Sequence, residues 1–190
     1  MQRNPVVYMT VTHTVSAASG SLGRYYFSAS AQWHTMPFWR FEDSVGSCAQ
    51  NIAIDPGTQG GYYSYHYSMG SSAATSSGNA QYNITEYQNV INGNWYGSAG
   101  LFSIPVDYSG GGTTYICTNL FATYHFYAYV SQPTLPSYFN SVGSYDHREL
   151  SIGWNDISIN IGGEVSASIG LSPAFGHTRR SAEVIIYREG

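Results

Sequence analysis

The stretch RYYFSASAQWH, residues 24–34, decides the fold. Apolar and aromatic residues occupy every second position of it, namely Tyr25, Phe27, Ala29, Ala31 and Trp33. The positions between them carry Tyr26, Ser28, Ser30, Gln32 and His34. Successive side chains of a β-strand point to opposite faces, so this period predicts a strand with one face in a hydrophobic core. Trp33 is therefore expected to be a core residue.

Residues 6–16 show the same alternation just before this strand. One face carries Val7, Met9, Val11 and Val15, and His13 falls among them. Residues 17–23 are mostly small and predict a loop or a tether. Consecutive strands usually pair, so pairing with residues 24–34 is the default expectation. The alternative is that residues 1–16 act as an exchanged strand that completes the sheet of a neighbouring molecule.

The rest of the chain also favours strands, because apolar residues recur at two rather than at 3.6 positions. Strands are predicted at residues 48–54, 62–69, 82–90, 101–108, 114–130 and 182–188. The last of these strands is expected to pair at the centre of its sheet. Residues 38–47 are expected to form a corner before the strand at residues 48–54. In the longest strand, Ile116, Leu120, Ala122 and Tyr124 are expected on the core face. Its length suggests a bend or a bulge, or two strands joined near Asn119. Gly162-Gly163 predicts a two-residue hairpin turn between residues 150–161 and 164–171.

Many short strands, glycine-rich turns and no crossover helix predict an all-β fold. The expected architecture is an antiparallel β-sandwich, jelly-roll-like, and a closed β-barrel is the alternative. The length of 190 residues suits one domain, so residues 1–190 are expected to form a single β-sandwich domain.

The chain has few charged residues, and acidic residues outnumber basic ones. Only 9 % of the residues are charged, and all seven cationic residues are arginine, which gives a net charge of −4. Such a chain offers no basic surface for phosphates, so nucleic acid is not an expected partner. No apolar run approaches the length of about 20 residues that a transmembrane helix needs. A polar but weakly charged surface favours a secreted or cell-surface protein.

Cys48 and Cys117 are the only cysteines, and no C-x-x-C pair suggests zinc or redox chemistry. A Cys48–Cys117 disulfide would suit an oxidising compartment and is the expectation. Two buried free thiols are the open alternative.

The densest group of ionisable residues lies in the segment SYDHRELS, residues 144–151. Asp146 and His147 make it a candidate polar site, although a solvated turn before a strand is the favoured explanation. A hydrolase would need to assemble these residues with distant acids such as Glu42 and Asp43, and no nucleophile motif accompanies them. The histidines are too dispersed for a metal-binding motif, so no metal or other cofactor is expected.

The abundance of aromatic residues is the sequence feature that favours a binding function. They form 16 % of the chain and include 18 tyrosines, more than one core of this size has to hold. Tyrosine suits contact surfaces because it combines a large ring with a polar tip. The candidate ligand-binding residues are Tyr62, Tyr63, Tyr65, Tyr67, Trp95 and Tyr96, together with Asp146 and His147.

These observations favour a non-enzymatic, extracellular β-sandwich with a structural or adhesive role, for example as a subunit of a surface fibre or matrix. Its expected partners are further copies of itself, or an extracellular glycan or protein. A carbohydrate-binding module that uses surface tyrosine and tryptophan is the alternative. A hydrolase is the least favoured of the three.

Overall fold

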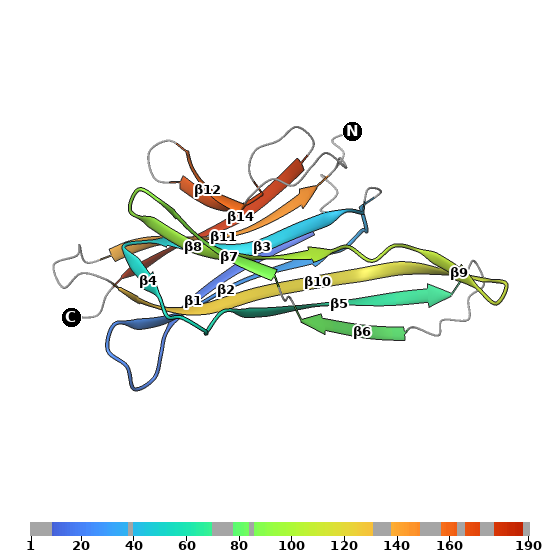
Figure 1. Ribbon diagram of the computed structural model, residues 1–190, viewed down its shortest axis with the longest axis horizontal. Coiled ribbons are helices and arrows are strands. Elements are labelled where there is room, and N and C mark those ends of the chain that lie inside the picture. The colour runs from blue at the N-terminus through green and yellow to red at the C-terminus, as the bar shows by residue number, and fades with distance from the viewer. Residues whose placement is uncertain are drawn as a thin grey trace, which may run out of the picture.

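The computed structural model describes residues 9–37, 40–69, 78–83, 86–130, 138–148, 157–162, 166–171 and 177–187. All regular elements within these ranges are strands, and they form antiparallel sheets that stack on one another (Figure 1). The two large sheets keep open edges and do not close into a barrel. The predicted all-β sandwich is thus confirmed.

Sheet A has seven strands. Its order is β1 (Met9–Ala17), β2 (Arg24–Trp33), β10 (Thr113–Val130), β5 (Gly60–Met69) and β6 (Gly78–Asn83), and β4 (Ile52–Ile54) and β9 (Tyr108–Gly110) pair with the ends of β10. β10 is 18 residues long, and its hairpin with β9 extends beyond the sandwich (Figure 1).

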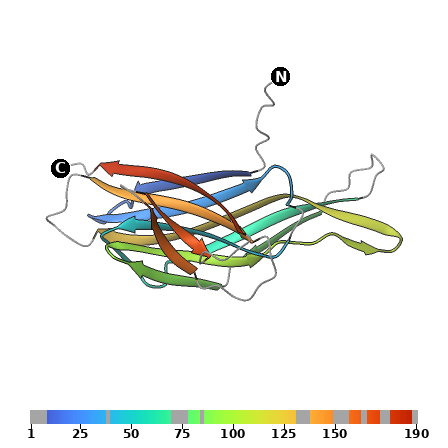
Figure 2. The same cartoon turned by 90° about the horizontal axis from the view of Figure 1, so that it is seen from above.

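Sheet B has five strands, and a separate hairpin forms sheet C. The order in sheet B is β14 (His177–Tyr187), β11 (Tyr138–Arg148), β3 (Glu42–Gln50), β8 (Trp95–Ser103) and β7 (Glu86–Asn92). Sheet C consists of β12 (Ile157–Gly162) and β13 (Ser166–Leu171), which lie across sheet B as a third layer (Figure 2). β3 and β11 are therefore covered on both faces, and nearly all their residues are buried.

The main core lies between sheets A and B. Phe27, Phe126 and Tyr124 from sheet A meet Phe139 and Tyr145 from sheet B, and none of these five side chains is more than 1 % exposed. Trp33 is 7 % exposed and belongs to the same cluster, as its place in the alternation predicted. A smaller second cluster contains Cys48, Trp95, Ala99, Leu101, Val142 and Ile159, and joins sheet B to sheet C.

β1 pairs with β2 of its own chain over nine residue pairs, from Met9–Trp33 to Ala17–Tyr25. His13 is buried at 8 % exposure and crosses to sheet B, where its Nε2 lies 2.7 Å from the Ser141 hydroxyl. Its ring rests on Gly143, where an added Cβ would lie 2.8 Å from the imidazole. A glycine at this point of β11 lets the two sheets approach closely.

A β-bulge in β10 decides which of its side chains face the core. Thr118 pairs with His66 and Phe121 with Ser64, so Asn119 and Leu120 together oppose one residue of β5. Asn119 adopts a φ of 54°, as the extra residue of a bulge often does. The predicted bulge is confirmed, but Ile116 is 41 % exposed rather than inside, because the bulge reverses the alternation before it.

Several predicted boundaries are wrong. Residues 42–47 belong to strand β3 and do not form a corner. The polar residues in this segment concealed the strand from sequence reasoning, because they are buried inside the molecule instead of facing solvent. The single strand predicted at residues 82–90 is two strands, β6 and β7, which belong to different sheets. Residues 101–108 do not form one strand, because β8 ends at Ser103 and Val106 is 57 % exposed. β14 lies at an edge of sheet B and not at its centre.

The hairpin of β12 and β13 is confirmed, with a different connection. Gly162 pairs with Ser166, so three residues join the strands instead of two, and the predicted part of the first strand before Ile157 lies outside the described residues. The conformation of the connection lies outside the described residues.

The expected disulfide is not formed. Cys48 and Cys117 are both free and buried. Cys48 faces sheet C from β3, whereas Cys117 faces the main core from β10, so the two thiols belong to different clusters. The alternative of two buried thiols is the one that the fold adopts.

Candidate functional site

Asp146 and His147, the predicted polar site, lie inside the molecule. Asp146 is fully buried and His147 is 4 % exposed, because β11 runs through the middle of sheet B. The predicted solvated turn at this point is wrong. Instead, His147 lies opposite Asp43 of β3, and its Nδ1 is 3.0 Å from the nearer carboxylate oxygen.

Asp43 is the centre of a buried polar network. Its carboxylate accepts hydrogen bonds from the Tyr145 hydroxyl, from the His147 ring and from the Arg148 backbone N–H. Tyr145 in turn accepts a 2.8 Å hydrogen bond from the Trp33 indole. The network therefore links β2 in sheet A to β3 and β11 in sheet B.

The pKa shifts in this network come mainly from burial of its members. Burial raises the pKa of Asp43, although His147, Tyr145 and Arg148 oppose the effect. Burial and the neighbouring Asp43 raise the pKa of Tyr145 well above its ordinary value. An Asp–His pair resembles part of a hydrolytic site, yet catalysis needs access for a substrate and a nucleophile beside the histidine. The donors to Asp43 all come from β11, and the Trp33–Tyr145 hydrogen bond joins this group to sheet A.

The predicted tyrosine ladder of β5 divides between two faces. Tyr63, Tyr65 and Tyr67 point inward and pack in or against the main core. Tyr62 points outward, where its ring lies 5.9 Å from that of Phe121. Strand alternation makes this division unavoidable, so the four residues cannot form one platform.

The second predicted platform is also internal. Trp95 is 3 % exposed and belongs to the cluster between sheets B and C. Tyr96, its neighbour in β8, is partly buried against the main core. Of the candidate binding residues, only Tyr62 thus faces outward on sheet A.

A different set of aromatic residues shares the outer face of sheet A. We call it the aromatic face and define it by Tyr26, Tyr62, Phe121, His125, Tyr127 and Tyr129. Tyr26 lies 5.1 Å from Tyr127 and 5.6 Å from His125, measured between ring centroids. Tyr129 is 44 % exposed, and the other five are half-buried among their neighbours. Within the described ranges, no strand packs on this side of sheet A (Figure 1).

Hydroxyl and amide groups fill the middle of the aromatic face. Ser30 donates a 3.0 Å hydrogen bond to Thr123, and Thr123 donates to the Ala29 carbonyl at 3.2 Å. The Gln32 amide donates to the carbonyls of Trp33 and Leu120. Because these protons are committed to the protein, Ser30 and Gln32 present oxygen lone pairs as acceptors.

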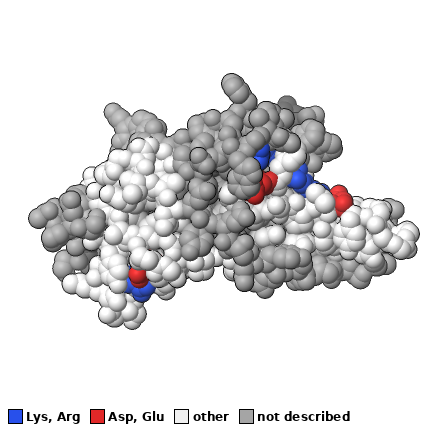
Figure 3. Space-filling view, viewed as in Figure 1, with Lys and Arg blue, Asp and Glu red and all other residues white. Residues whose placement is uncertain are grey.

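One end of the aromatic face carries an ion pair. Arg24 donates two hydrogen bonds to Asp55, at 2.7 and 3.0 Å, and its guanidinium lies 4.1 Å from the centre of the Tyr127 ring. The two charges offset each other. Burial lowers the pKa of His125, so this ring is neutral at pH 7. Charged side chains are also sparse over the described part of the surface in Figure 3.

Sequence reasoning missed most of the aromatic face, although its signal was present. Tyr26, Ser28, Ser30 and Gln32 occupy the polar phase of residues 24–34. Their partners on β10 are known only from the pairing of Tyr127 with Tyr26 and of Thr123 with Ser30. The sequence of one strand shows what shares its face, but not which strand lies beside it.

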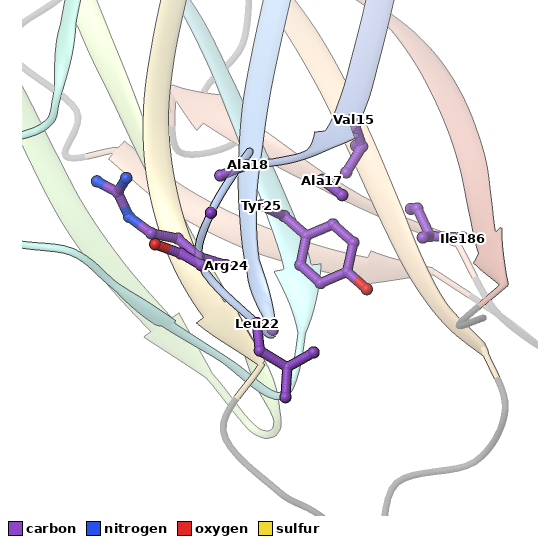
Figure 4. A pocket seen from close by; sticks show the side chains of 10 residues that line it. Val15, Ala17, Ala18, Leu22, Arg24, Tyr25 and Ile186 are labelled. Atoms are coloured by element: carbon purple, nitrogen blue, oxygen red, sulfur yellow. The ribbon is translucent and has the colours of Figure 1, made fainter. Parts of the chain in front are cut away.

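A hollow of about 630 Å³ lies at the end of the sandwich where β1 turns into β2 (Figure 4). Val15, Tyr25 and Ile186 supply apolar walls, and the loop of residues 18–23 supplies backbone. Leu22 is fully exposed beside it. Its one charged residue, Arg24, is paired with Asp55, so the hollow offers a ligand no unpaired charge.

The described residues contain no group of three or more His, Cys, Asp or Glu residues that could hold a metal ion. They also include no helix with the length and hydropathy that crossing a membrane requires. No protein-family model matches the chain, and no curated protein matches it.

Proposed function

We propose that the protein is a non-enzymatic extracellular β-sandwich with an adhesive role, and that it adheres by binding carbohydrate on the aromatic face. The observation that carries this proposal is the outward row of aromatic rings on sheet A, with oxygen acceptors between them. Aromatic rings stack on the C–H faces of pyranose rings, and acceptor oxygens receive sugar hydroxyls.

The interior supports a binding role over a catalytic one. Asp43 and His147 are buried and hydrogen-bonded to each other across two neighbouring strands of sheet B. The low charge and the absence of lysine favour an extracellular setting, as the sequence suggested, while the two free thiols add no argument for it.

Retention on insoluble polysaccharides tests the proposal. We expect the purified protein to be retained on at least one of cellulose, chitin and xylan, and a Tyr26→Ala/Tyr127→Ala double variant to lose that retention. Tyr138→Ala is the matched control, because Tyr138 is a 45 % exposed tyrosine on sheet B. Failure of the native protein to bind any of the three would refute carbohydrate binding, and equal retention of the double variant would refute the aromatic face as the site.

A further inference from the structure

We propose that the ligand of the aromatic face is an extended, uncharged polysaccharide that lies lengthwise along β10. This inference rests on the proposed carbohydrate binding and adds the class and the direction of the chain. It follows from the order of the outward residues on β10, from their neighbours on β2 and β5, and from the charge of the surface.

The aromatic rings follow the direction of one strand. After the bulge, the outward residues of β10 are Phe121, Thr123, His125, Tyr127 and Tyr129. Eight residues of extended strand span about 26 Å, which exceeds the length of a disaccharide and suits an oligosaccharide. Towards the β1 edge of sheet A the rings stop, because the outward residues of β1 are Thr10, Thr12, Thr14 and Ser16. A ligand that uses most of the rings must therefore run along β10.

The rings form two groups separated along the strand. Tyr26, His125 and Tyr127 make the first group, with centroid distances of 5.1 and 5.6 Å. Tyr62 and Phe121 make the second, with a centroid distance of 5.9 Å. From Phe121 to Tyr127 the strand rises about 20 Å. One sugar ring cannot contact both Phe121 and Tyr127, the most distant members of the two groups, whereas one extended chain can.

Acceptor oxygens lie beside the rings on β2, with Ser30 opposite Thr123 and Gln32 opposite Phe121. Ser30 and Gln32 use their protons on Thr123 and on backbone carbonyls, which leaves oxygen atoms to accept from a ligand. Gly60 opposes His125 on β5 and leaves room for its ring, since an added Cβ would lie 3.2 Å from Nε2. At Gly60, β5 thus adds no side chain beside the His125 ring.

The charge of the surface selects an uncharged chain. The ion pair of Arg24 and Asp55 offsets its own charges, and the outward positions of β10 carry no carboxylate or guanidinium. A polyanion would find no cationic group that is not already paired in this row. A neutral polysaccharide needs none.

Titration calorimetry with soluble oligosaccharides tests the inference. The probes are cellobiose and cellohexaose, xylobiose and xylohexaose, and hexagalacturonate as the polyanion. We expect one neutral hexaose to bind at least tenfold more tightly than its disaccharide, and hexagalacturonate to bind more weakly than that hexaose. Tyr127→Ala and Phe121→Ala remove one ring from each group, and each should weaken binding of the hexaose by about tenfold.

The controls separate this inference from the proposed function. Tyr138→Ala should leave affinity unchanged, and the thermal unfolding of every variant establishes that it is folded. If Phe121→Ala does not fold, Tyr62→Ala replaces it, because Tyr62 is the other ring of that group. Normal hexaose affinity in either variant, equal affinity for disaccharide and hexaose, or preference for hexagalacturonate would overturn the lengthwise neutral chain while carbohydrate binding stood. Absence of binding to every oligosaccharide and to insoluble polysaccharide would refute both.

Discussion

His13 shows how one buried side chain can make stability depend on pH. Its Nδ1–H donates to the Ser28 carbonyl at 3.0 Å, and its Nε2 lies 2.7 Å from the Ser141 hydroxyl. Burial lowers the pKa of His13 to about 4, with the hydrogen bond to Ser28 opposing the shift. A proton therefore binds the unfolded chain more strongly than the folded one, and acid destabilises the fold.

The first prediction concerns this proton. Stability that His13 contributes is present above its unfolded pKa of 6.5 and is lost as the pH falls towards 4, by about 3 kcal/mol in total. In His13→Gln that loss should disappear, so the free energy of unfolding should change by about 3 kcal/mol less between pH 7 and pH 4. Urea unfolding at several pH values measures the difference. Asp43 titrates in both proteins and cancels in the comparison. Parallel pH profiles would contradict the assignment.

Tyr145 is the second residue whose effect can be measured. Tyr145→Phe removes the acceptor of the Trp33 indole and a donor to Asp43, and leaves both groups buried. Because buried polar groups without partners are costly, we expect the free energy of unfolding to fall by about 2–4 kcal/mol, measured by chemical unfolding. Tyr138→Phe on the same strand is the matched control, since Tyr138 is 45 % exposed. A loss no larger than that of the control would show that the network contributes little.

At the scale of elements, the bulge of β10 matters most. It places Leu120, Ala122 and Tyr124 in the core, and Phe121 and Tyr127 on the aromatic face. Without the extra residue, the alternation would exchange the two sets, because a shift by one residue reverses every side chain. The candidate site thus depends on one backbone irregularity.

The third prediction tests that irregularity. Asn119 has a φ of 54° and is exposed, so its replacement affects the backbone more than packing. Asn119→Gly should leave the free energy of unfolding almost unchanged. Asn119→Val should lower it by about 1–3 kcal/mol, because β-branched residues are strained at positive φ. Thermal unfolding of the two variants compares them directly. Equal stability would show that the bulge does not require this conformation.

Local patterns predicted the elements better than their partners. Alternation placed Phe27 and Trp33 in the core, and the length of β10 predicted its bulge. The burial of Asp146 was not predictable, because sheet C covers β11 and this layer leaves no trace in the sequence of β11 itself. The pairing of Asp43 with His147 and of Tyr26 with Tyr127 depends on strand order. Strand order comes from contacts between distant segments, which no single stretch encodes.

At the scale of the whole molecule, β1 and β14 are edge strands of different sheets. β1 completes sheet A of its own chain, the arrangement that the sequence favoured over exchange. Pairing with a neighbouring molecule remains a prediction for solution studies, in which a monomer at high concentration would argue against it. The arrowheads of β1 and β14 point the same way in Figure 2, so Met9 and Tyr187 lie at opposite ends of the sandwich.

This arrangement of the two edge strands sets the response to mechanical load. Tension applied through the two ends of the described chain would draw β1 and β14 apart along their own axes. Nine residue pairs between β1 and β2, and eleven between β14 and β11, would then bear the force together rather than one after another. Single-molecule pulling should give a higher rupture force in this direction than with handles at Leu22 and Tyr187, which peel strands from one end. Load between the two ends of the described chain would thus act on both edge strands in shear.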